Sequence, residues 1–224
     1  MELFDNVNKT FKDDLSDTIR KGSRISIAAA CFSMYAFQEL KKQLEGIEEL
    51  RFIFTSPTFT TEKAERESRE FYIPRLHREK SLYGTEFEVR LRNELTQKAI
   101  AKECAEWIRS KVSFKSNITS EMLMGFANVD EVSYSPLNGF TTVDLGCERG
   151  NNMFTAIMKT TSAENSRYYI RKFDEIWNDA NRLQDVTEEV IESISTAYNE
   201  NSPDFIYFVT LFNIFSEFLE DISE

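Results

Sequence analysis

The apolar residues at the start of the chain recur with the spacing of a helix. Over residues 4–19 they lie three or four positions apart, with Asp and Lys between them: Phe4, Val7, Phe11, Leu15 and Ile19. This spacing predicts an amphipathic helix that Gly22 ends. Residues 24–30 are short, apolar and rich in isoleucine and alanine, so they predict a buried strand.

A second helix and a second strand follow in the same order. Ser33 is placed to cap a helix that runs to Gly46, and residues 50–54 predict another buried strand. Strand, helix and strand at this spacing form one βαβ unit, which favours parallel strands. The start of the chain therefore predicts an α/β fold.

The middle of the chain is predicted to mix one helix with short strands. Residues 58–85 are polar and give no clear assignment. A helix is expected over 95–109, where four residues share an apolar face: Ile100, Cys104, Trp107 and Ile108. Short strands are then expected at 112–114, 122–129, 140–145 and 153–158.

The end of the chain is predicted to be helical. One helix covers 169–177, and Asp185 with Glu188 forms a capping box for the next. Ser202-Pro203 starts a third, which carries an apolar stripe to Ile222. We expect the stripe to pack on the preceding helix, at Val190, Ile191 and Ile194. The alternative is that the stripe is an interface for another domain, in which case residues 204–222 would be unprotected from hydrogen exchange in the isolated chain.

The poor capping of this last helix bears on domain organisation. Its final turn holds Glu220 and Asp221, which oppose the helix dipole, so we expect the chain to be cut from a longer protein. We expect an α/β domain at 1–180, and at 181–224 an acidic, all-helical extension that leads toward a further C-terminal region.

Composition and cysteine usage indicate a cytoplasmic globular protein. The chain has 224 residues with 19 Phe, 7 Gly and 4 Pro, which favours long regular elements over loops. The sequence has no 18-residue apolar run and no secretory signal, so no membrane contact is expected. Cys31, Cys104 and Cys147 are far apart and odd in number, and they predict three buried thiols in a reducing compartment.

The charge is unevenly placed along the chain. The net charge is −11, and residues 173–224 hold 13 acids against the single base Arg182. Residues 62–115 hold 13 bases against 10 acids, a weak basic excess. If DNA is bound, binding should be weak and salt-sensitive. The phosphate contacts are then expected from five bases of this range: Arg75, Arg78, Lys80, Arg90 and Arg92.

The residues of the common catalytic sites are scarce. His77 is the one histidine, it lies in a charged stretch, and we expect it at the surface. No glycine-rich phosphate loop and no Gly-x-Ser-x-Gly elbow occurs in the sequence, and no cofactor is expected. Three acids could be considered as metal ligands: Asp130, Glu131 and Asp144. We expect them to be solvated and expect no metal to be bound.

One stretch resembles a known family. Residues 135–146, Ser-Pro-Leu-Asn-Gly-Phe-Thr-Thr-Val-Asp-Leu-Gly, are similar to the Gly-Ser-x-Asn-Phe-Thr…Gly-Leu stretch of phospholipase D-like domains. Residues 150–154 and 173–177 resemble the closing strand and helix of that family. The resemblance covers about residues 1–180 and implies a mixed or parallel sheet flanked by helices. Asn138, Thr141 and Thr142 would then be remnants of the family site.

A narrower resemblance concerns the N-terminal phospholipase D-like domain of bacterial Snf-type superfamily 2 helicases. The order and spacing of three stretches carry it: residues 27–33, 54–59 and 198–203. This resemblance implies that the parent protein is an ATP-dependent helicase and that its motor domain, on the same chain, is a partner.

The sequence departs from this family at the catalytic motif. Active members use His-x-Lys-x₄-Asp twice, one histidine attacking phosphorus and the other acting as general acid. The motif should fall within 122–130, which holds neither His nor Lys, and no Lys lies between Lys115 and Lys159. A dimer could not restore it, since neither copy supplies the nucleophile.

The expected function is therefore a non-catalytic accessory module that docks nucleic acid, a protein or a second copy of itself. Two alternatives stay open. One is an active phosphodiesterase with other catalytic residues, and the other is a pure protein-interaction or dimerisation domain.

Overall fold

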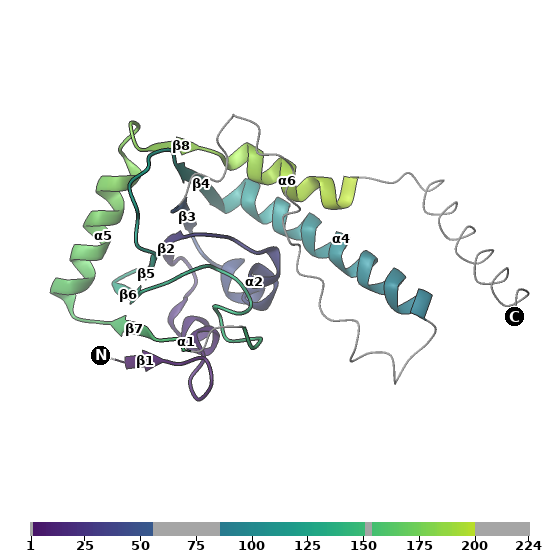
Figure 1. Ribbon diagram of the computed structural model, residues 1–224, viewed down its shortest axis with the longest axis horizontal. Coiled ribbons are helices and arrows are strands. Elements are labelled where there is room, and N and C mark those ends of the chain that lie inside the picture. Colours follow the sequence, from purple (N-terminus) through teal and green to yellow (C-terminus); the bar gives the residue numbers. More distant parts are fainter. Residues whose placement is uncertain (1, 56–85, 151–153, 200–224) are drawn as a thin grey trace, which may run out of the picture.

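One mixed sheet, covered on both faces by helices, forms the body of the molecule (Figure 1). The computed structural model describes residues 2–55, 86–150 and 154–199, with the backbone alone at 86–95 and 196–199. Within them the sheet has eight strands in the order β1-β7-β6-β5-β2-β3-β4-β8. Among the helices of these segments, none is long and apolar enough to span a membrane. The predicted class, an α/β fold with a mixed sheet flanked by helices, is confirmed.

The elements follow one another in a mixed order along the chain. The strands are β1 Glu2–Phe4, β2 Arg24–Ala29, β3 Glu49–Phe54, β4 Val112–Asn117, β5 Phe126–Val129, β6 Val132–Ser135, β7 Ile157–Thr160 and β8 Leu183–Asp185. The helices are α1 Phe11–Thr18, α2 Met34–Glu39, α3 Lys41–Leu44, α4 Glu86–Lys111, α5 Ala163–Trp177 and α6 Thr187–Asn199.

The centre of the sheet is the predicted parallel unit. β2 pairs in parallel with β3, and β3 with β4, while the remaining pairs are antiparallel. Ser33 caps α2 as predicted, by accepting a hydrogen bond from the backbone N–H of Tyr35 at 3.2 Å. The expected single helix up to Gly46 is divided into α2 and α3 at Leu40.

The two faces of the sheet are covered unequally. Figure 1 shows α5 on one side of the sheet and α1, α2, α4 and α6 on the other. The larger core lies on the side of these four helices, where α4 contributes the buried side chains of Ile100, Cys104, Trp107 and Ile108 as predicted. A smaller cluster lies beneath α5, around Ile53, Phe126 and Phe173.

The first helix is shorter than the periodicity predicts. Phe4 belongs to β1, which pairs with β7, and the helix starts only at Phe11, after the cap residue Thr10. Between them the Asp5 carboxylate accepts hydrogen bonds from the backbone N–H groups of three following residues, which form a turn. These bonds hold the pKa of Asp5 well below its usual range.

Several predicted strands are misplaced. Residues 140–145 form turns, because Thr141 and Asp144 bond to each other and the Leu145 N–H donates to the Thr141 carbonyl. The strand expected over 122–129 is limited to β5, and the strand expected over 153–158 starts later, as β7. The short strands β1, β6 and β8 were not predicted.

The extension that was expected to be all-helical from 181 on begins with a strand, β8, so the chain on both sides of position 180 contributes to the same sheet. β8 pairs with β4, and α6 packs beside α4. The Asp185 carboxylate accepts from the backbone N–H of Thr187 at 3.0 Å, in the position of a cap, although no reciprocal bond from Glu188 accompanies it within the described residues. Val190, Ile191 and Ile194 are buried in the larger core, whereas the stripe expected to cover them, at 202–222, lies outside the described residues.

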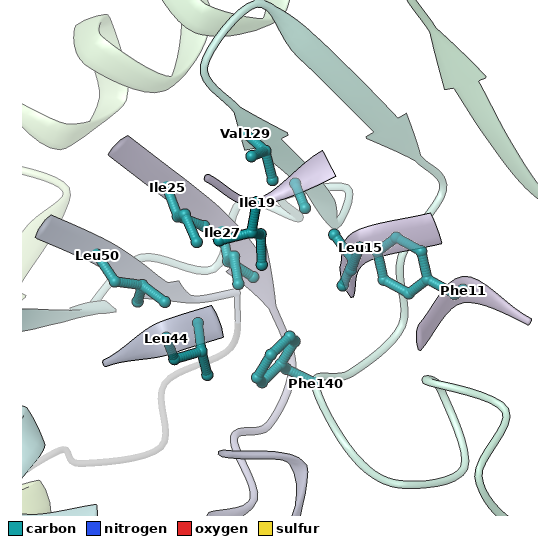
Figure 2. A pocket seen from close by; sticks show the side chains of 10 residues that line it. Phe11, Leu15, Ile19, Ile25, Ile27, Leu44, Leu50, Val129 and Phe140 are labelled. Carbon is teal, nitrogen blue, oxygen red and sulfur yellow. The ribbon is translucent and has the colours of Figure 1, made fainter. Parts of the chain in front are cut away.

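A small apolar cavity lies in the larger core between α1 and the sheet (Figure 2). Its volume of about 10 Å³ is at the lower limit for holding one water molecule, and apolar side chains alone line it, among them Leu15, Ile27, Val129 and Phe140. A water there would find no hydrogen-bond partner, so we expect the cavity to be dry.

Filling this cavity should stabilise the protein. Val129→Ile adds one methyl group toward the space, and one buried methylene contributes about 0.8 kcal/mol. We therefore expect an increase of about that size in the free energy of unfolding, measured by urea titration. Val7→Ile is the control, because Val7 is 83% exposed and its substitution should change little. A loss of stability in Val129→Ile would mean that the neighbouring side chains cannot accommodate the added group.

Candidate functional site

The carboxyl ends of β2, β3 and β4 meet at one edge of the sheet, which we call the carboxyl edge. In sheets with parallel strands, ligands commonly bind outside these ends. Three segments meet there: the chain that leaves β2 at Ala30, the segment 117–125 between β4 and β5, and the loop 136–147 after β6.

Asn117 ties the ends of these strands together. Its side-chain amide donates to the carbonyls of Thr55, at 3.1 Å, and Glu121, at 2.8 Å. Its side-chain oxygen accepts from the backbone N–H and the hydroxyl of Thr119. Asn117 is buried, and both N–H donors of its side chain are engaged in these hydrogen bonds, so its role is to hold the segment before β5 in place.

The backbone at Gly125 lies directly against the loop after β6. The Leu137 N–H donates to the Gly125 carbonyl at 2.9 Å, and the Ala30 N–H donates to the Asn138 carbonyl at 2.8 Å. A Cβ atom at position 125 would lie 1.8 Å from the Leu137 carbonyl oxygen and 3.0 Å from the Ala28 carbonyl oxygen. No side chain fits at position 125 without displacing this backbone.

The remnant site that the resemblance implies lies in the loop 136–147. Asn138 is exposed, and Thr141 donates to the Asp144 carboxylate at 2.6 Å. The Thr142 carbonyl accepts from the Cys147 N–H. Thr141 and Thr142 thus bond within their own loop, and the three residues do not converge on a common pocket among the described cavities.

The thiol of Cys31 lies against this loop. Its sulfur lies 2.7 Å from where a Cβ of Gly139 would be, and the Asp144 carboxylate lies beside the same point. Cys31 is exposed as a residue, but neighbouring atoms partly desolvate its sulfur. This desolvation and the nearby negative charge of Asp144 raise the pKa of the thiol, so it stays protonated at neutral pH. The thiol lacks the electropositive surroundings that make a cysteine nucleophilic.

The prediction of three buried thiols is wrong for two of them. Cys104 is buried, Cys147 is half-buried and Cys31 is exposed; all three are free. Cys31 lies two residues after the end of β2, at the carboxyl edge. The apolar residues around it in the sequence therefore did not predict its burial correctly. Burial and the nearby Glu39 raise the pKa of Cys147 to about 11.

The catalytic motif of the family that the sequence resembles can be compared with the structure through its aspartate. A His-x-Lys-x₄-Asp pattern that ends on Asp130 puts its histidine at Leu123 and its lysine at Gly125. Leu123 packs against the apolar cluster beneath α5. Asp130 lies at the far end of β5, where its carboxylate accepts from the Ser23 hydroxyl, at 2.7 Å, and the Arg24 N–H.

The side chains of the other predicted site residues are not among those that the structure describes. His77, Arg75, Arg78 and Lys80 lie outside the described residues, and Arg90 and Arg92 lie in the first half of α4, where only the backbone is described. In the described segments, no group of three His, Cys, Asp or Glu side chains is placed to hold a metal ion.

Exposed apolar side chains at the carboxyl edge are a feature that the sequence reading missed. In the segment between β4 and β5, Met122 is 99% exposed and Met124 59% exposed, and Ile118 also faces solvent. Leu123, between the two methionines, turns inward. The run Met-Leu-Met at 122–124 was predicted to be part of a strand. The polar residues Thr-Ser-Glu just before it could have indicated a loop instead.

Comparisons with known proteins find similarity to solved structures. No family model matches the sequence, and no curated protein matches it. The solved structure of phosphatidylserine synthase from Haemophilus influenzae Rd KW20 is similar, with 11% identity and a TM-score of 0.48 over 89% of this chain and 43% of that chain. This chain thus spans less than half the length of that chain.

Proposed function

We propose that this chain is a non-catalytic phospholipase D-like module that docks a macromolecular partner. In keeping with the narrower resemblance, we propose that it serves as the N-terminal accessory domain of a bacterial Snf-type helicase. The observation that carries the loss of catalysis is at Gly125. The motif spacing that ends on Asp130 requires a lysine at this position, and the Leu137 carbonyl occupies the space where its Cβ would lie.

The inward position of Leu123 supports the same proposal. A catalytic histidine must present a ring nitrogen to the phosphorus of a bound substrate. The side chain at the corresponding position is instead an aliphatic group packed among the residues beneath α5. The polar groups needed to hold and cleave a phosphodiester are thus replaced by apolar packing and a backbone contact.

The character of the carboxyl edge favours a protein as the docked partner. Exposed methionines are adaptable apolar contacts, and apolar side chains grouped on a surface usually mark an interaction site. Several cations of the described residues are taken up by carboxylates, for example Lys41 by Glu103 and Arg51 by Asp174. Nucleic acid stays the second candidate, through the bases of 62–115, and a second copy of the chain is the third.

The chain should lack phosphodiesterase activity. Purified protein incubated with single- and double-stranded DNA, with and without divalent metal ions, should cleave neither, because the nucleophile and the phosphate-binding lysine are missing. His77→Ala should behave like the parent chain. Cleavage that copurifies with the protein and is lost in His77→Ala would contradict the proposal.

The backbone contact at Gly125 should make this position intolerant of any side chain. Gly125→Ala forces the Leu137 backbone to move, and we expect it to lower the free energy of unfolding by about 2–4 kcal/mol, measured by urea titration. Gly46→Ala is the matched control, because its added methyl would meet its nearest atom at 3.4 Å, an ordinary contact. Equal stability of the two variants would show that position 125 has room for a side chain and would remove the main support for lost catalysis.

Any binding to DNA should be electrostatic. Charge reversal of Arg75 and Arg78 together should weaken binding and lower the slope of log affinity against log salt by about one per contact removed. Lys9→Glu, a reversal outside 62–115 of a residue paired with Glu2, is the control in a fluorescence-anisotropy titration. Salt-independent binding, or binding unchanged by the double reversal, would exclude this surface.

A further inference from the structure

A row of polar side chains crosses the sheet on the face that α5 covers. Cross-strand pairing links six polar residues, one from each of six neighbouring strands: Thr160, Ser133, Asn128, Ser26, Arg51 and Ser113. Ser133, Asn128 and Ser26, in the middle of this polar row, are buried. A buried polar group is costly unless it forms hydrogen bonds, so each of these groups needs a partner.

Three contacts satisfy part of the polar row. The Ser133 hydroxyl bonds to the Asn128 side-chain oxygen at 2.8 Å, and Arg51 donates through Nη2 to the Ser26 hydroxyl at 3.1 Å. Arg51 Nη1 lies 2.9 Å from the Asp174 carboxylate of α5. Two buried atoms are left without a partner in the described part of the chain, Asn128 Nδ2 and Arg51 Nε.

Both of these atoms carry N–H groups, so the missing partner is an acceptor. Asn128 is 3% exposed, which excludes bulk solvent as its partner. If the amide is turned over, the Ser133 hydroxyl accepts instead of donating, and the amide oxygen then lacks a donor. A ligand that both donates and accepts satisfies either orientation, and water is such a ligand.

The charge and the size of the surroundings favour water over an anion. Asp174 already neutralises Arg51, so an anion would add an unpaired negative charge beneath the helix. Asn128 and Arg51 flank Ser26 on the strands either side of β2, about 10 Å apart at the backbone. Ser26 lies between these two residues and has the smallest side chain of the three, so a ligand seated above it would face both unpartnered donors.

We propose that an internal water molecule is bound above Ser26, beneath α5, where it accepts hydrogen bonds from Asn128 Nδ2 and Arg51 Nε. Its own protons face the Ser26 hydroxyl and the Asp174 carboxylate, which have lone pairs to accept them. Buried waters typically form about three hydrogen bonds, which this position can supply. The proposal rests on α5 and the central strands, and it holds whatever partner the carboxyl edge docks.

Water–protein nuclear Overhauser measurements on the full chain test this proposal. The side-chain amide protons of Asn128 should show a contact with a long-lived water. Asn117 is the internal control: it is also a buried asparagine, but both of its amide donors already bond to carbonyls, so it should show none. The absence of the contact at Asn128, or a crystal structure in which Asn128 bonds directly to Ser26, would overturn the proposal.

Two variants of Ser26 sharpen the test. Ser26→Val places a methyl group where the water would lie and should abolish the contact at Asn128, while Ser26→Ala leaves the space and should retain it. Sulfate added at constant ionic strength should not shift the Asn128 amide resonances. A specific response to sulfate would show that the site holds an anion and would overturn the assignment to water. If Ser26→Val fails to fold, the presence or absence of the water contact at Asn128 in the parent chain and in Ser26→Ala still decides the proposal.

Discussion

The position of β2 in the middle of the sheet constrains the rest of the structure. Its residues from Ile25 to Ala29 are all buried, so both faces of this strand must be covered. One face meets a large apolar core supplied by four helices, and the other meets α5. Because a single helix cannot cover a wide sheet with apolar side chains alone, the α5 side combines a small apolar cluster with the polar row and the Arg51–Asp174 pair.

The close approach of Gly125 and Leu137 links this architecture to function. β5 and β6 form a hairpin that pairs with β2, and the backbone just outside the hairpin closes on itself at the carboxyl edge. In the position where the resemblance calls for a phosphate-binding lysine, the chain has a main-chain contact. The edge is then available for apolar residues, and Met122 and Met124 project from it.

The sequence predicted the central unit well, because its signals are local. An isoleucine-rich strand, a serine cap and a second apolar strand define β2, α2 and β3 without reference to distant residues. The peripheral strands were missed since they are only three or four residues long. β1 and β8 pair only with strands far away in the chain, and β6 joins its neighbour β5 to the distant strand β7. Phe4 illustrates this: its helical spacing with Phe11 is real, but pairing of its strand with β7 decides its conformation.

The sequence predicted which catalytic residues the candidate site lacks, but it did not predict the geometry of the site. The missing His-x-Lys pair can be read from the sequence, whereas the reason that a lysine cannot be accommodated at 125 is a backbone approach between segments twelve residues apart. Likewise, nothing in the sequence separates Leu123, which turns inward, from the two methionines that turn outward. These differences depend on the direction in which the loop leaves β4, which Asn117 fixes through contacts with Thr55 and Glu121.

The two tryptophans of the chain lie in different layers. Trp107 stacks on Phe37 in the larger core, with ring centroids 4.7 Å apart, and donates its indole N–H to the Leu44 carbonyl. Trp177 ends α5 on the other side, with the Lys115 ammonium 4.7 Å from its ring centroid and the Arg51 guanidinium 5.7 Å away. Each indole is therefore a native optical reporter for one side of the sheet. Replacing either with phenylalanine leaves a fluorophore whose emission tells whether the α5 layer melts together with the main core or before it.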